Sequence, residues 1–230
     1  MEYAATPPAI ATADTQGFLA KVFGWMFLGL LITGLVAAAI GSSDTLLTDI
    51  TESPWIMIGL IVVQIGLVIT ISAAIERLSP AVALGLFFLY AASVGVIFAL
   101  VFELYTTQSI FTTFLITAAM FGAVGAWGYL TKRDLSTMGT VLLMALVGLI
   151  LATIVNVFVA SEALYWVTTY AGVAIFAGLT AYDMQKIKGY AKAGLEGDAE
   201  QRASILGALA LYLDFINLFL FLLRIFGRSR

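Results

Sequence analysis

The chain is 230 residues long, with 62% hydrophobic residues and only 11% charged residues. A soluble domain carries about 25% charged residues and is about half apolar, so this composition excludes that class and predicts a polytopic membrane protein. The small net charge of −3 and the lack of a basic tract argue against a nucleic-acid partner.

Cysteine and histidine are both absent from the sequence. This excludes disulfides, thiolate or imidazole metal sites, and catalysis by Cys or His, and we expect no covalently bound cofactor. Carboxylate and carbonyl oxygens suffice for a calcium site, so an oxygen-only cation site remains open.

The chain begins with a polar stretch, residues 1–17, which contains Pro7 and Pro8 and lacks the basic start of a secretory signal. We predict a short disordered tail there, followed by one transmembrane domain over residues 18–230. Seven apolar segments in that domain are each long enough to cross a bilayer, which takes a helix of about 20 residues. The predicted all-α fold therefore has helices at residues 18–40, 55–75, 81–102, 109–131, 137–160, 163–187 and 205–226.

Basic residues are confined to alternate ends of these segments. They lie at the start of the first segment or in or beside the loops after the second, fourth and sixth, at Lys21, Arg77, Lys132, Arg133, Lys186, Lys188, Lys192 and Arg202. The positive-inside rule then places the N-terminus in the cytoplasm, and the short loops suit a bacterial inner membrane. Seven crossings leave Arg224, Arg228 and Arg230 outside, as an exception to the rule.

Two aspartates lie inside apolar segments, Asp183 in residues 163–187 and Asp214 in residues 205–226. A carboxylate in hydrocarbon is costly, so each needs a partner or a proton. Helix tilt could bring the two side chains level. Two like charges about 4 Å apart at an effective dielectric of about 20 repel by about 4 kcal/mol, which favours one shared proton. We predict a pH-sensitive latch between these helices that doubles as a cation site, with both aspartates as ligands.

Neighbouring polar residues leave alternatives open. Lys186 follows Asp183 by one turn and could make a simple interfacial ion pair with it. Asn217 follows Asp214 by one turn and could be its hydrogen-bond partner or only support helix packing. Arg77, next to Glu76, could extend to the membrane interface or reach inward to hold a gate.

Three motifs resemble the BAX inhibitor-1 (transmembrane BAX inhibitor motif) family. They are residues 131–136 (TKRDLS), residues 181–187 (AYDMQKI) and, most specifically, residues 212–219 (YLDFINLF). The resemblance covers all seven predicted helices and is most specific from Phe121 onward.

This resemblance implies two three-helix layers around a central seventh helix. It also implies a pH-sensitive calcium leak, with Asp183 and Asp214 as the sensor and with calcium and protons as the species that it handles. By motif, Arg77 matches an arginine that ties down the helix closing the pore.

The chain also departs from the family pattern. Met184 stands where the family usually has threonine. Residues 55–75 offer only Gln64 in mid-helix, with Glu76 directly after their end, where channel-type relatives have an acid within the helix.

Two other function classes compete with a channel. An intramembrane aspartyl protease also carries Tyr-Asp and Asp on successive helices, but that family has Gly-x-Gly-Asp and a later Pro-Ala-Leu, whereas Asp214 follows Leu-Tyr-Leu and no proline follows Pro80. We therefore expect no enzyme activity. The second rival is a membrane modulator that binds a protease or a cell-death or stress factor as its membrane partner and moves no ions.

Overall fold

The computed structural model describes residues 10–230, with side chains from Thr15 onward, and these residues are almost entirely helical. Within them, seven helices are long and apolar enough to cross a membrane, which confirms the predicted all-α fold. In chain order the elements are α1 (Ile10–Gly41), α2 (Asp44–Glu52), α3 (Pro54–Ala74), the 3₁₀ turn η1 (Ile75–Arg77), α4 (Pro80–Leu104), α5 (Thr107–Leu130), α6 (Ser136–Val159), α7 (Glu162–Lys192) and α8 (Gly197–Phe226).

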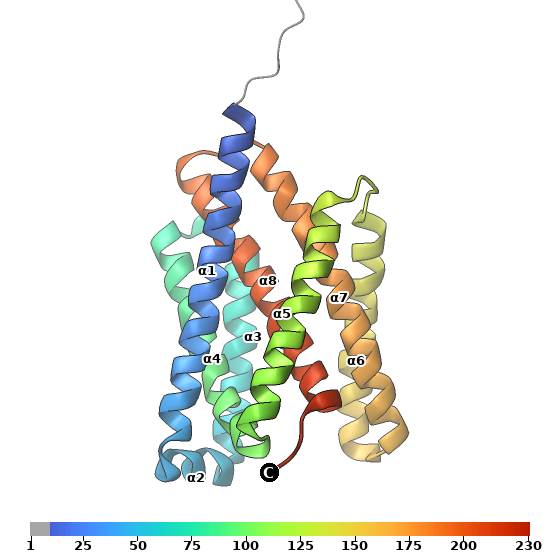
Figure 1. The fold of residues 1–230 in the computed structure, drawn as a ribbon. Helices are drawn as coiled ribbons and strands as arrows, with labels where there is room; N and C mark the ends of the chain where they lie inside the picture. The colour runs from blue at the N-terminus through green and yellow to red at the C-terminus, as the bar shows by residue number, and fades with distance from the viewer. Residues whose placement is uncertain (1–9) are drawn as a thin grey trace, which may run out of the picture.

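The spanning helices form two groups of three with α8 between them (Figure 1). Helices α1, α3 and α4 pack together as the first group, and α5, α6 and α7 form the second. Helix α8 contacts both groups and is the most deeply buried of the seven. The predicted arrangement around a central last helix is therefore confirmed.

The start of the chain differs from the prediction. Helix α1 begins at Ile10, so residues 10–17 are helical, whereas the predicted tail over residues 1–9 lies outside the described residues. The helix can extend about two turns beyond its apolar part because no proline interrupts it after Pro8.

A short helix, α2, was missed between the first two spans. Ser43 caps it by accepting a hydrogen bond from the Leu46 backbone N–H at 3.4 Å, and Ile50 is its buried residue. Too short and too polar to span a membrane, α2 lies across the end of the bundle opposite the start of α1 (Figure 1).

Tyr212 fixes α8 against the first group of helices. Its side chain is fully buried, and its hydroxyl lies 2.6 Å from the Thr33 hydroxyl on α1. Its ring meets Phe87 of α4 edge-on, with centroids 5.6 Å apart. Residues two apart point to nearly opposite sides of a helix, so the same packing directs Asp214 toward the second group.

Candidate functional site

The carboxyl groups of Asp183 and Asp214 lie within hydrogen-bonding range of each other across the interface between α7 and α8. Asp214 is only 3% exposed, and its Oδ2 atom has no hydrogen-bond partner among the described residues. Asp183 is half-buried. Two carboxylates are both acceptors, so a hydrogen bond between them requires one proton. The geometry is that of a proton-sharing pair.

Thr180 of α7 completes the buried side of this pair. Its hydroxyl lies within hydrogen-bonding range of Asp214 and also donates to the Phe176 carbonyl at 2.8 Å. The Thr180 oxygen is thus a further polar atom beside the buried carboxyl group. In the sequence Thr180 stands out only by its place one turn before Asp183.

A cavity of about 210 Å³ reaches the pair from the end of the bundle where α1 begins. Asp183 and Lys186 of α7 line it together with Ser72 of α3, and Asp214 is not among its lining residues. We call it the inner cavity. Access to the pair through this cavity therefore leads to Asp183 first.

A second cavity, of about 400 Å³, lies closer to the same end of the bundle, and we call it the outer cavity. Tyr190 and Leu206 line both cavities, so these two side chains lie between them. The Lys186 ammonium lies 6.0 Å from the centre of the Tyr190 ring, which holds this aromatic side chain beside the inner cavity.

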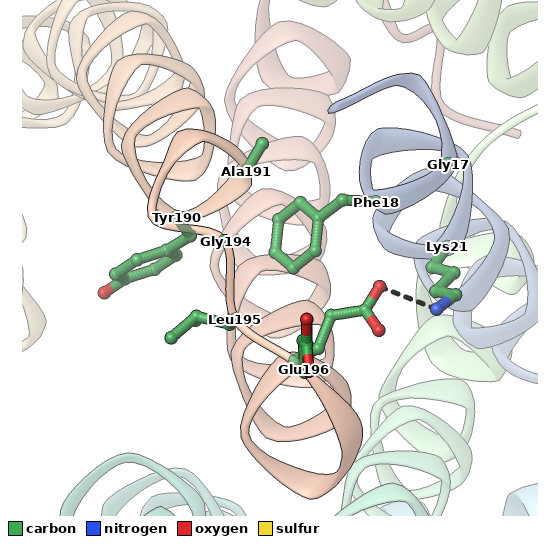
Figure 2. Close-up of a pocket in the computed structure, with 9 residues that line it drawn as sticks. Gly17, Phe18, Lys21, Tyr190, Ala191, Gly194, Leu195 and Glu196 are labelled. Atoms are coloured by element: carbon green, nitrogen blue, oxygen red, sulfur yellow. Dashed lines mark hydrogen bonds and ion pairs between the residues drawn. The ribbon is translucent and has the colours of Figure 1, made fainter. Parts of the chain in front are cut away.

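The turn between α7 and α8 borders a third cavity, of about 350 Å³, at this end (Figure 2). Phe18 and Lys21 of α1 face the turn, and Lys21 Nζ lies 2.6 Å from Glu200 Oε1 on α8. Gly194 and Gly197 have φ values of 63° and 58°, a left-handed conformation that side chains disfavour. These glycines let the chain reverse sharply between the two helices that carry the aspartates.

Gln185 of α7 fastens the loop between α5 and α6. Its side-chain oxygen accepts from the Leu135 backbone N–H at 2.8 Å, and its amide donates to the Arg133 carbonyl at 2.8 Å. Lys188, one turn later, donates to the Tyr129 carbonyl at the end of α5. The structure thus joins two of the motifs noted in the sequence, residues 131–136 and 181–187, two residues away from Asp183.

Helices α5 and α7 also meet through their backbones near the pair. A Cβ atom at Gly128 would lie 2.7 Å from the Cα of Ala181, which is too close for any side chain at this position. Glycine at this position therefore sets the approach of α5 to the segment of α7 that carries Asp183.

Arg77 and Glu76 lie apart from the aspartate pair. Both side chains are exposed, and Arg77 makes no hydrogen bond or ion pair with a described residue. Arg202 of α8 binds this turn instead, by donating to the carbonyl oxygens of Glu76 and Leu78, each at 3.3 Å. The arginine that ties the end of α3 to α8 is thus Arg202.

Lys186 and Asn217 lie close to the aspartates without forming an ion pair or a side-chain hydrogen bond with them. Lys186 is exposed and shares the inner cavity with Asp183, near enough to act on its charge. Asn217 donates to the Leu213 carbonyl of its own helix at 2.8 Å, which is a local contact within α8.

The aspartate pair provides few ligands for a metal ion. The part of the chain that the structure describes contains no group of three or more Asp or Glu side chains placed to hold a metal ion. Asp183 and Asp214 together offer two carboxyl groups.

Related sequences cover nearly the whole of this chain. The family model described as inhibitor of apoptosis-promoting Bax1 matches residues 15–230. The inner membrane protein YbhL of Escherichia coli strain K12 is 49% identical over 220 residues, which cover 95% of this chain and 94% of YbhL. An uncharacterised protein of Borreliella burgdorferi is 44% identical over 93% of this chain and 92% of its own length.

A membrane protein of Streptococcus pyogenes is 35% identical over 92% of this chain and 93% of its own length. The match to the family model extends over nearly the whole chain, including all seven spanning helices and the aspartate pair. The chain is a membrane protein that belongs to the family of inhibitors of apoptosis-promoting Bax1.

Proposed function

We propose that this protein is a pH-sensitive calcium leak, gated by the Asp183–Asp214 pair. The observation that carries the proposal is the contact between these two carboxyl groups at the interface of α7 and α8, with Asp214 buried. A shared proton joins the two helices, whereas two negative charges about 4 Å apart at an effective dielectric of about 20 repel by about 4 kcal/mol. Proton occupancy therefore changes how α7 and α8 pack, and with it the conductance.

Calcium is the cation that this chemistry favours. Both aspartates and the Thr180 hydroxyl offer oxygen ligands, which suit a hard divalent cation. A calcium ion takes about 6–8 oxygen ligands, so two carboxylates bind it weakly enough for it to leave again. Such a site suits a passing ion better than a resident one.

Access to the pair supports a role in transport. The outer and inner cavities follow one another from the end of the bundle where α1 begins, and Tyr190 and Leu206 separate them. With the N-terminus in the cytoplasm, as the distribution of basic residues predicts, protons and cations reach Asp183 from the cytoplasmic side.

The same geometry argues against a protease. Two aspartates that cleave a peptide bond must both reach it, but Asp214 is 3% exposed and does not line the inner cavity. A cavity of about 210 Å³ is also smaller than the roughly 300–1,000 Å³ of sites for small ligands, and a peptide needs more room.

The proposal is tested by calcium flux into liposomes that contain only the purified protein, measured over a series of pH values. We expect wild-type flux to change with pH and Asp214→Asn flux to stay constant. Asp198→Asn, which alters an acid in the exposed first turn of α8, is the matched control and should behave as wild type.

An unaltered pH response in Asp214→Asn would refute the gating role. No flux from the wild type at any pH would favour the other function instead, a membrane modulator of a protease or a stress factor.

A further inference from the structure

The opposite end of the bundle, where the chain ends, contains a cavity that the gating site does not use. Its volume is about 450 Å³, and it lies between the start of α5 and the end of α8. Arg228, Thr106, Gln108 and Thr112 form its polar wall, and Ile116 and Phe226 form its apolar wall.

The backbone holds Arg228 in place at this cavity. The Thr106 N–H donates to the Arg228 carbonyl at 3.0 Å, and the Arg230 N–H donates to the Leu104 carbonyl at 3.1 Å. These bonds pair the C-terminal residues with the turn between α4 and α5, beside which the chain ends in Figure 1. The cationic wall is therefore part of the fold.

The charge of Arg228 is not neutralised within the described chain. Arg230 forms an ion pair with Glu103, at 3.5 Å, whereas Arg228 is exposed and has no acidic partner among the described residues. A guanidinium beside hydroxyl and amide groups favours a phosphate or another anion.

The apolar wall extends the cavity along the direction of the membrane normal. Ile116 lies nine residues after the first residue of α5, which corresponds to about 14 Å along the helix. A polar, cationic mouth at the helix end, beside Phe226, and an apolar side chain deeper in the membrane, Ile116, match the two ends of a phospholipid. A soluble anion would use only the mouth.

We propose that this cavity binds an anionic phospholipid, with its phosphate at Arg228 and the start of an acyl chain against Ile116 and Phe226. The predicted topology supports the same site. It leaves the C-terminal arginines on the outer side of the membrane, against the positive-inside rule. Anionic lipid in the outer leaflet of the membrane provides the counter-charge that Arg228 lacks among residues 10–230.

Native mass spectrometry of the purified protein, with phosphatidylglycerol or phosphatidylcholine added, tests the proposal. We expect the wild type to prefer phosphatidylglycerol by about fivefold, the effect of roughly one basic residue at a membrane surface. Arg228→Gln should abolish this preference, and Thr112→Trp, an exposed position on the cavity wall, should abolish it by filling the space. Arg133→Gln, an exposed arginine at the other end of the bundle, should preserve it.

Three results would overturn the proposal. They are a wild type without lipid preference, an Arg228→Gln variant that retains the full preference, and competition by soluble glycerol phosphate as strong as that by the lipid. The last result would identify the mouth as a site for a soluble anion. None of these measurements involves calcium flux, so the lipid site and the proposed leak can fail independently.

Discussion

Asp214 contacts Asp183 across the interface of α7 and α8, yet the inner cavity is lined by Asp183 and not by Asp214. The exchange of protons or cations with the pair therefore passes through Asp183, while Asp214 is the buried member with an oxygen that lacks a partner. Because of this asymmetry, we expect substitutions of Asp183 and of Asp214 to have different effects.

Replacing Asp214 by leucine should destabilise the protein and remove its response to pH. The change leaves the Asp183 carboxyl without its partner across the interface of α7 and α8. We expect the free energy of unfolding to fall by roughly 1–3 kcal/mol, measured as a lower melting temperature in detergent micelles. Asp198→Leu, at an exposed position, should change it by less than about 0.5 kcal/mol. An equal or higher melting temperature for Asp214→Leu would show that the pair does not hold the two helices together.

Removing the Tyr190 side chain should open the inner cavity to reagents. The chain contains no cysteine, so a single Ala210→Cys substitution, at a half-buried position that lines the inner cavity, reports on access to that cavity. We expect a water-soluble thiol reagent to label Ala210→Cys several-fold faster when Tyr190→Ala is added, because Tyr190 lies between the inner and outer cavities.

Tyr170→Ala, an exposed tyrosine of α7 with a 58% exposed side chain, is the control for this labelling experiment and should leave the rate unchanged. Equal labelling rates with and without Tyr190→Ala would show that Tyr190 does not limit access.

Gln185→Leu should loosen the loop between α5 and α6. The substitution removes the hydrogen bonds to Leu135 and Arg133, worth roughly 1–3 kcal/mol together. We expect a lower melting temperature and faster hydrogen exchange at residues 131–135. Gln201→Leu, at an exposed position on α8, should alter neither, and a loop that exchanges at the wild-type rate in Gln185→Leu would disprove the role of this contact.

Gly128→Val should force α5 and α7 apart. The new side chain would collide with the backbone of Ala181, and overpacking of this kind costs roughly 1–3 kcal/mol. Gly122→Val on the same helix has no atom within 4 Å of the new Cβ and should be tolerated. Both variants can be compared by thermal unfolding and by the pH response of flux. Equal stability of the two would contradict the close contact.

The sequence alone determined the membrane class, the seven spans and the two aspartates inside apolar helices. These properties are local, because each span must supply about 20 apolar residues and satisfy its own backbone hydrogen bonds. For the same reason the amphipathic α2 was missed, since it lies outside the spans and carries no long apolar run.

Only the tertiary structure decided which side chains meet. Gln185 and Leu135 are 50 residues apart, and Arg202 reaches the turn at Glu76 from 126 residues away, so helical periodicity predicts neither contact. The sequence pointed to Arg77 at that turn, and the fold places Arg202 there because α8 passes beside the end of α3. Side-chain partners depend on how the helices cross, and crossing is set by packing of the whole bundle, including contacts such as that between Gly128 and Ala181.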